Sequence, residues 1–282
     1  CPARKSDIMA PSFLDLRQRV LLRRIKNNAK DLTEIDLVDA NLGPKAICKI
    51  LDALHGNKVV KTLWLSGNSM GDRGAVALAD LLKASDSVCQ VILGLNEISA
   101  TGAVALSGAL MDDDAVLDVL CMGANFNVGD LGASAIGDAL RKNSSLIELW
   151  LRDNGIGVKG AKTLADGLTQ NDTLKELWLG GNKMGDEGAI AFAQSFRSAK
   201  TISVMDLSNN GISDVGASAL RDALERNSSI IKLDLSGNDI KDSIVGDIKE
   251  LVSANNKRAK EERRKEFTKA ASEVTVATTS ST

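Results

Sequence analysis

A nine-residue pattern recurs along most of the chain, and its regular spacing limits the fold more than any other feature of the sequence. In Leu174–Asn182, apolar residues occupy the first, fourth and sixth positions and an asparagine occupies the ninth. Successive copies mostly start 28 residues apart. The clear copies start at Val60, Val88, Leu146, Leu174, Ile202 and Ile230, and weaker ones start at Leu32 and Val116. Such a period indicates eight copies of one supersecondary unit, stacked so that neighbours bury each other's apolar surface.

Each unit is expected to contain a short strand followed by a helix. Residues such as Leu177 and Leu179 alternate with an outward residue, which is typical of a strand. Further along each unit, apolar residues recur four apart, as at Leu78 and Leu82, which places them on one face of a helix. The predicted fold is therefore an α/β solenoid, a curved arc with a parallel β-sheet on its concave side and helices on its convex side.

The asparagine at the ninth position has a physical use in such a unit. A turn contains backbone groups without partners, and a buried amide can both donate and accept hydrogen bonds. We expect these side chains to stack as a ladder, interrupted where Ala40 and Ala124 take the position. The ladder comprises Asn68, Asn96, Asn154, Asn182, Asn210 and Asn238. A second column, expected to end each helix in the left-handed conformation, comprises Asn57, Asn143, Asn171, Asn227 and Asn255.

These units resemble the leucine-rich repeats of the ribonuclease-inhibitor class. Asn68–Gly74 and Asn182–Gly188 both read N-x-M-G-D-x-G, an ending that is typical of that class. The resemblance covers about residues 32–255 and implies a solenoid that serves as a binding scaffold. We divide the chain into an N-terminal tail and helical cap (1–31), a leucine-rich repeat domain of eight repeats (32–255), and a charged helical extension with a disordered tail (256–282).

The N-terminal segment is predicted to end in a helical cap. Residues 1–11 are polar and expected to be loose, and Ser12 is placed to cap a helix that runs to about Lys26. The apolar residues expected to cover the open end of the first repeat are Phe13, Leu16, Val20, Leu21 and Ile25. The outer side carries Arg17, Arg19, Arg23, Arg24 and Lys26. We interpret this basic side as a solvated face, or alternatively as a patch for an acidic partner.

The fourth unit departs from the period. The step from Val116 to Leu146 is 30 residues, so we place an insertion of two residues near Ala124–Phe126. Insertions in repeat proteins map to loops on one edge, which is often the binding edge. Phe126 is expected either to protrude there or to fill the core position of its unit.

Composition argues against several classes of function. The formal net charge of −2 does not favour nucleic-acid binding. The single histidine, His55, provides neither a metal-ligand set nor a catalytic triad, so we predict no enzyme activity, no metal and no cofactor. Gly155–Gly160 matches a dinucleotide-binding pattern, but its glycines fall where other units also have glycine. The unpaired cysteines and the lack of a membrane-spanning apolar run favour a cytoplasmic protein, with cytoskeletal association left open.

The residue between the two buried strand positions of each unit should point out of the concave face. This column reads Asp36, Trp64, Ile92, Leu120, Trp150, Trp178, Asp206 and Asp234, and it holds every tryptophan of the chain. An apolar stripe framed by charge is typical of a protein interface, although stacked tryptophans can also simply stiffen a sheet. The predicted binding residues are Trp64, Ile92, Leu95, Leu120, Met122, Glu148, Trp150, Arg152, Asp153, Glu176 and Trp178.

Three functions are compatible with these patterns. The first is a non-enzymatic scaffold that holds a protein partner on the tryptophan-lined face. The second is an actin- or microtubule-associated module, because the predicted helix followed by Asp31–Leu37 resembles the start of the tropomodulin repeat domain. The third is a GTPase-activating protein similar to the Ran activator, a family that uses an arginine and an asparagine on the repeat edge. That family carries an acidic tail, whereas residues 256–282 are mixed in charge.

Overall fold

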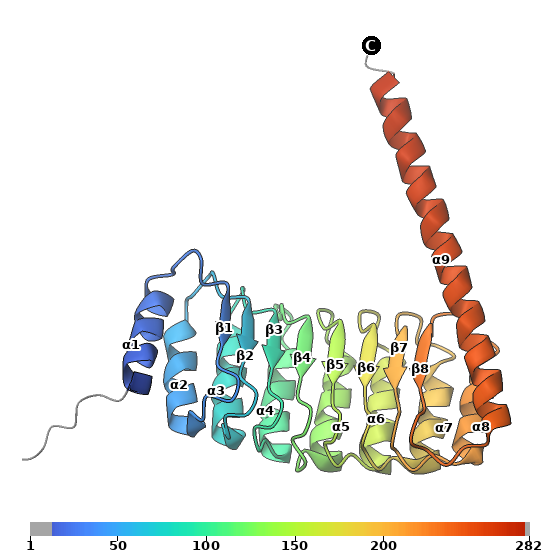
Figure 1. The fold of residues 1–282 in the computed structure, drawn as a ribbon, viewed down its shortest axis with the longest axis horizontal. Helices are drawn as coiled ribbons and strands as arrows, with labels where there is room; N and C mark the ends of the chain where they lie inside the picture. Colours follow the sequence, from blue (N-terminus) through green and yellow to red (C-terminus); the bar gives the residue numbers. More distant parts are fainter. Residues whose placement is uncertain (1–12, 280–282) are drawn as a thin grey trace, which may run out of the picture.

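Within residues 13–279, which the computed structural model describes, eight short strands form one parallel sheet, and each strand pairs with the next in sequence (Figure 1). Every connection between neighbouring strands passes through a helix, as parallel pairing requires. The strands are β1 (Glu34–Asp36), β2 (Thr62–Trp64), β3 (Gln90–Ile92), β4 (Val119–Cys121), β5 (Glu148–Trp150), β6 (Glu176–Trp178), β7 (Val204–Asp206) and β8 (Lys232–Asp234). The predicted α/β leucine-rich repeat solenoid is confirmed.

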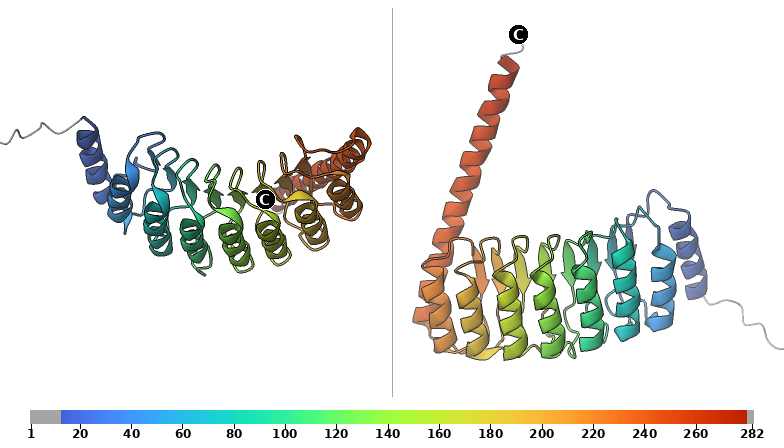
Figure 2. Two further views of the ribbon diagram at one scale, coloured as in Figure 1. Left: turned by 90° about the horizontal axis from the view of Figure 1, so that it is seen from below. Right: turned by 180° about the vertical axis from the view of Figure 1, so that it is seen from behind.

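The helices form the outer layer of the arc, and the sheet lines its inner side (Figure 2). They are α1 (Phe13–Lys26), α2 (Gly43–Leu54), α3 (Gly71–Ala84), α4 (Ala100–Leu110), α5 (Gly129–Leu140), α6 (Val158–Leu168), α7 (Gly185–Ser195), α8 (Asp214–Leu224) and α9 (Asp242–Thr279). The core lies between these two layers. Leu177 of β6 and Leu164 of α6, for example, are both fully buried.

The glycines of the Gly155–Gly160 segment serve the packing of α6 on α5. A side chain at Gly160 would lie 2.8 Å from Ala133 Cβ and 2.9 Å from Asp130 Oδ1. Asp130 Oδ1 also accepts hydrogen bonds of 2.8 Å from the backbone N–H groups of Gly157 and Gly160. Because a carboxylate of the preceding repeat already occupies these donors, they are not free to hold a phosphate.

The asparagine ladder joins each turn to the next repeat through amide hydrogen bonds. Asn182 Oδ1 accepts from the backbone N–H groups of Asn154 (3.1 Å) and Ile156 (3.0 Å). Asn182 Nδ2 donates to the carbonyl oxygens of Leu151 (2.9 Å) and Leu179 (2.8 Å). The same arrangement recurs at Asn96, Asn68 and Asn238 with small variations. A single buried side chain therefore serves two donors and two acceptors of neighbouring turns.

The register of the fourth repeat differs from the prediction by one residue. Leu120 pairs with Leu149, and Cys121 pairs with Trp150, so the unit starts at Leu117 and not at Val116. The two extra residues therefore lie in different places. One is in the outer turn after α4, and the other is in the turn after β4. Leu120 and Met122 are core residues with 0% exposure, so their assignment to the concave binding surface was wrong.

Asn125 takes the ladder position that was assigned to Ala124. Its Oδ1 accepts from Asn96 N (3.1 Å) and Ile98 N (3.0 Å), and its Nδ2 donates to Met122 O (2.8 Å). The ladder is thus continuous through this repeat. The extra residue of the turn after β4 leaves Phe126 66% exposed, while Val128 fills the core position.

The second asparagine column has a different role from the one predicted. None of its members is among the residues with positive φ. Instead, these buried amides form a further ladder at the opposite edge: Asn143 Nδ2 donates to Leu110 O (2.8 Å), and Asn143 Oδ1 accepts from Leu146 N (2.8 Å). Asn255, inside α9, donates to Asn227 O (2.8 Å) and Ile230 O (3.1 Å). The column therefore ties each helix end to the neighbouring repeat.

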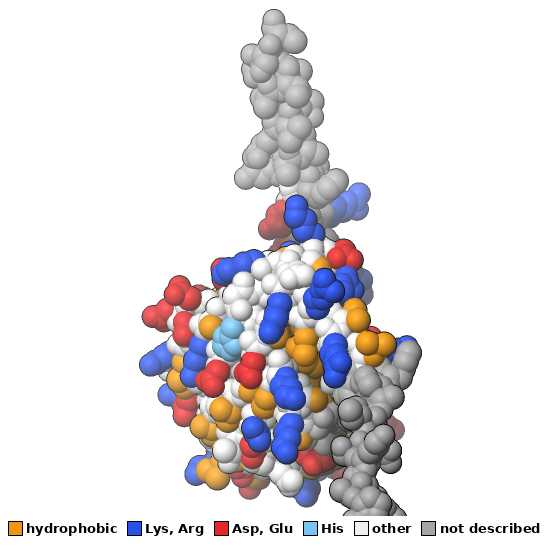
Figure 3. All heavy atoms as spheres, turned by 90° about the vertical axis from the view of Figure 1, so that its left-hand side faces the viewer, with side chains coloured by type: hydrophobic (Ala, Val, Ile, Leu, Met, Phe, Trp, Pro, Cys, Tyr) orange, Lys and Arg blue, Asp and Glu red, His pale blue; other side chains and the backbone are white. Residues whose placement is uncertain are grey.

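The N-terminal helix α1 packs on the first repeat with a face that was only partly predicted. Ile25 is fully buried, and Leu21 and Leu22 pack beside it. Leu16 and Val20 lie on the other side of the helix and are 53% and 55% exposed, so their prediction as buried residues was wrong. Figure 3 shows this end of the molecule, where basic and apolar side chains lie together. Ser12 and residues 1–11 lie outside the described residues.

The last helix starts as the outer layer of repeat eight and then extends away from the solenoid (Figure 1). It runs to Thr279, so the disordered tail predicted at the end of the 256–282 segment is helical up to this residue; residues 280–282 lie outside the described part. After Gly246 the sequence contains neither glycine nor proline, so nothing in it breaks the helix. None of the helices in the described residues is long and apolar enough to cross a membrane.

Candidate functional site: the concave face

One column of side chains crosses the concave face, because the strands pair in register. Trp64 of β2 lies next to Ile92 of β3, and Trp150 of β5 lies next to Trp178 of β6. Cys121 stands between Ile92 and Trp150, in the place expected for Leu120. Neighbouring positions in this column are about 4.8 Å apart, the spacing of strands in a sheet. The sheet thus brings the three tryptophans onto one surface.

The central feature of this surface is a pair of stacked indoles. The ring centroids of Trp150 and Trp178 are 4.4 Å apart, with an interplanar angle of 14°. Each indole N–H donates to a glutamate two residues earlier, Trp150 Nε1 to Glu148 Oε2 (3.3 Å) and Trp178 Nε1 to Glu176 Oε2 (3.1 Å). The stack and these hydrogen bonds fix the orientation of both rings, so the surface is rigid before any partner binds.

Trp178 also has cationic neighbours. The Arg152 guanidinium carbon lies 5.0 Å from the centroid of its ring, and Lys232 Nζ lies 4.8 Å from it. Since Trp150 comes from the β5 side and Lys232 comes from β8, Trp178 is contacted from both sides. The positive charges of Arg152 and Lys232 offset part of the surrounding negative charge. Their cation–π contacts with Trp178 hold the two long side chains in place. The sequence pattern gave no sign of Lys232, because β7 separates its strand from β6.

Asp206 is buried, although its column was predicted to point out of the concave face. Its side chain is only 1% exposed, and the Arg152 guanidinium reaches across β6 to within 2.5 Å of its carboxylate. Asp206 Oδ1 accepts from Ser208 N (2.9 Å). Arg152 therefore connects the tryptophan stack to a buried acid, and the C-terminal end of the predicted stripe is a structural ion pair.

The remaining predicted residues differ in how much surface they offer. Trp64 is 37% exposed and Leu95 is 58% exposed, whereas Ile92 is half-buried. Asp153 is exposed and has φ of +53°, so it forms the turn after β5. The open apolar surface thus lies between β2 and β5, on the N-terminal side of the indole stack.

The chemistry of the site does not resemble that of a nucleophilic enzyme. Burial raises the pKa of the Cys121 thiol, and burial together with the Asp118 carboxylate raises the pKa of Cys89, so both are held in the unreactive thiol form. Burial, aided by the Glu148 carboxylate, also raises the pKa of Asp118. Among the side chains that the structure describes, no group of three His, Cys, Asp or Glu residues is placed to hold a metal ion.

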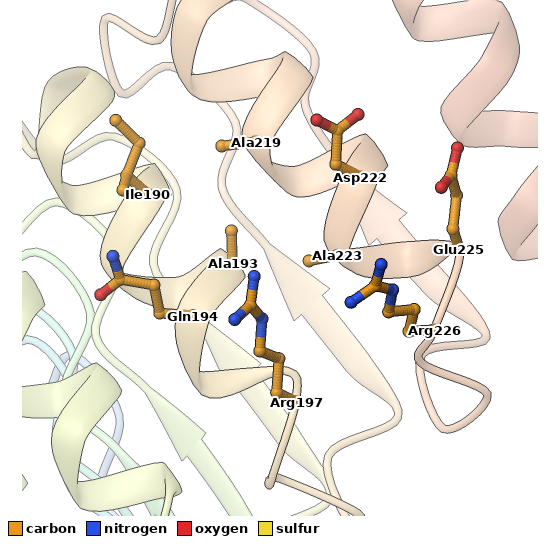
Figure 4. Close-up of a pocket in the computed structure, with 9 residues that line it drawn as sticks. All are labelled: Ile190, Ala193, Gln194, Arg197, Ala219, Asp222, Ala223, Glu225 and Arg226. Atoms are coloured by element: carbon orange, nitrogen blue, oxygen red, sulfur yellow. The ribbon is translucent and has the colours of Figure 1, made fainter.

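A groove of about 480 Å³ lies elsewhere, between α7 and α8 on the convex side. Arg197 and Arg226 lie at one end of it, and Asp222 and Glu225 lie on the α8 side (Figure 4). Small residues of the two helices, such as Ala193 and Ala223, leave this groove open. It contains no nucleophile with an adjacent base, so it adds no catalytic site.

Comparison with known proteins identifies the repeat. A family model described as Leucine Rich repeat matches residues 56–79, 142–165, 170–193, 199–220 and 226–248. These segments coincide with the strand-and-helix units of the solenoid. The chain is a leucine-rich repeat protein. No curated protein sequence matches it.

Two solved structures are similar along most of their length. One, titled Leiomodin-1 Actin-Binding Site 2 (ABS2), is 17% identical, with coverage of 93% of this chain and 99% of that chain and a TM-score of 0.30. The other is the tropomodulin C-terminal domain of Caenorhabditis elegans, which is 12% identical, with coverage of 87% and 97% and a TM-score of 0.27.

Proposed function

We propose that this protein is a non-enzymatic scaffold that binds a protein partner on its concave face. The observation that carries the proposal is the placement of all three tryptophans in one column of that face, with Trp64 unstacked and 37% exposed. Tryptophan and arginine dominate the energetics of protein interfaces. The indole stack could also serve the fold alone, but a stiffened sheet does not require an exposed tryptophan three strands away.

The face combines rigidity with mixed chemistry, as interface cores do. Trp150 and Trp178 are held by each other and by Glu148 and Glu176, so few rotamers are lost on binding. Apolar surface at Leu95 and Trp64 is bordered by carboxylates, which favour a partner with complementary positive charge.

Affinity purification with matched variants tests this proposal. Trp64→Ala should weaken capture of the partner by about 2 kcal/mol, roughly thirtyfold. Leu131→Ala is the control, because Leu131 is 67% exposed on α5, on the convex side. Equal capture by the wild type and both variants, with unchanged melting temperatures, would remove the concave face from the proposal.

A second candidate function is an actin- or microtubule-associated module that uses the N-terminal end. The specific observation is the outer face of α1, where Leu16 and Val20 are exposed beside the exposed side chains of Arg19 and Arg23. Such a face suits an acidic protein surface. Co-sedimentation with actin filaments or microtubules tests this function, and it should be lost in an Arg19→Glu/Arg23→Glu variant. Sedimentation that is absent in the wild type, or unaffected by the two substitutions, would exclude it. A GTP-hydrolysis assay separates both candidates from a GTPase activator.

A further inference from the structure

Trp64 and Trp150 lie at the two ends of an apolar strip on the concave face, and this strip is open to a partner. Trp178 is contacted by Trp150 on one side and by Lys232 from the other, whereas Trp150 has Trp178 on only one side. Among the described side chains, no aromatic or cationic group stacks on the second side of the Trp150 ring, the side toward β4. We call the surface from Trp64 through Ile92 and Cys121 to Trp150 the apolar strip.

The width of the apolar strip selects the kind of chain that fits it. Trp64 lies on β2 and Trp150 on β5, so the column spans three strand spacings, or about 14 Å. The two positions between them carry the smaller side chains of Ile92 and Cys121. An α-helix with its side chains is about 10–12 Å across and would contact both indoles at once. A single extended chain occupies only about 5 Å and would reach one indole only.

One end of the apolar strip continues onto the loop edge. Leu95, in the turn after β3, is 58% exposed, and Phe126, in the turn after β4, is 66% exposed. Phe126 stands out because of the extra residue in its turn. Both turns follow the ends of their strands, so these two side chains add exposed apolar surface at the edge toward which a helix lying along the strands would run.

The border of the apolar strip is mainly acidic. Asp36 and Asp39 lie on the β1 side, and Asp118, Glu148 and Asp153 lie on the β4 and β5 side. Lys61 is a basic side chain on the same border. Arg152 and Lys232 lie outside the strip, on the far side of Trp150. There both contact the Trp178 ring, and Arg152 also pairs with Asp206. A helix with lysine or arginine on both sides of its apolar stripe would therefore meet opposite charge on both sides.

We infer that the concave face binds one amphipathic, basic α-helix of its partner, seated along the strands between Trp64 and Trp150. This inference rests on the proposed function, since it names the partner's binding element at the same surface. The apolar stripe of the helix, with residues at i, i+3, i+4 and i+7, packs on Ile92 and the two indoles. Its flanking lysines or arginines face Asp36 and Glu148.

Selection from a displayed library of random linear peptides tests the inference. Peptides of roughly 18 residues, or five helical turns, are selected on the wild-type protein and counter-selected on Trp64→Ala. Trp64 is the cleaner site, because Trp150→Ala would also disturb the stack with Trp178. The selected sequences should show helical apolar periodicity with lysine or arginine beside it, and synthetic versions should bind Trp64→Ala roughly thirtyfold more weakly than Leu131→Ala.

Each other result overturns the inference. The selected peptides could instead be proline-rich, be acidic, or have apolar residues at every second position, as in a strand. Any of these results would show that the occupant is not a basic helix. Peptides that bind wild type and Trp64→Ala equally would place the site elsewhere. If partner capture depends on Trp64 but no basic helical peptide is selected, the proposed function stands and the helix inference fails.

Discussion

Asn182 and Asn154 occupy equivalent ladder positions, yet replacing them with alanine should have different costs. Without Asn182, the backbone N–H groups of Asn154 and Ile156 lose their acceptor, and Leu151 O loses its donor. Leu179 O keeps the Asn210 amide at 2.9 Å. An unpaired buried polar group costs about 1–3 kcal/mol, so three such groups give a loss of about 3 kcal/mol even at the low end.

Without Asn154, no backbone group loses its last partner. Met122 O keeps the Asn125 amide at 2.8 Å, and Arg152 O keeps Ala124 N at 2.8 Å. The Oδ1 atom of Asn154 is itself buried and has no hydrogen-bond partner. Asn154→Ala should therefore destabilise by about 1 kcal/mol, the value of an ordinary hydrogen bond.

Urea unfolding followed by circular dichroism measures this difference. Asn182→Ala should unfold at a clearly lower urea concentration than Asn154→Ala. Asn127→Ala is a suitable control, because Asn127 is exposed in the same kind of turn. Asn41 would be a poorer control, since its φ of +49° favours asparagine over alanine. Equal midpoints for Asn182→Ala and Asn154→Ala would refute the hydrogen-bond reasoning.

Three further predictions follow from single contacts. Trp150→Ala should weaken partner binding by about 2 kcal/mol. Trp178→Ala should have a smaller effect, because the Trp178 ring is already contacted from both sides. Equal binding titration curves for the two variants would contradict this prediction. Asp206→Ala should lower the free energy of unfolding by about 1–3 kcal/mol, since Ser208 N loses its acceptor and Arg152 its carboxylate; an unchanged urea midpoint would contradict this. Burial alone would raise the pKa of Asp186, but hydrogen bonds from Ser213 and Gly216 outweigh it and leave the pKa lowered. Asp186 therefore stabilises the fold above its unfolded pKa of about 3.9, and this is lost as pH falls through the lower folded value, so the difference in melting temperature between wild type and Asp186→Asn should shrink on acidification.

The sequence period predicted the architecture because each repeat satisfies the same local rules. The strand leucines, the ladder amides and the helix faces recur at fixed offsets, and the structure places them accordingly. The exception in repeat four arose because Val116 and Leu117 are both apolar and either could start the unit. The decisive signal was present in Asn125, which lies eight residues after Leu117 and restores the full pattern.

Other features depend on contacts between repeats that no local pattern encodes. Asp206 appeared to be an outward residue, but Arg152 extends across β6 and pairs with it. Lys232 similarly reaches Trp178 from two strands away. The buried side of α1 was predicted only in part, because that helix contains apolar residues on both sides and only docking on the first repeat decides which side is covered.

Quenching of tryptophan fluorescence tests the central claim most directly. The chain has only three tryptophans, and all lie in the concave column, so intrinsic fluorescence reports on this face alone. Acrylamide quenching is measured with and without a saturating amount of the partner captured by affinity purification. The account predicts that the partner lowers the quenching constant, in the wild type and in Leu131→Ala alike. An unchanged quenching constant with the partner fully bound would show that the concave face is not the interface.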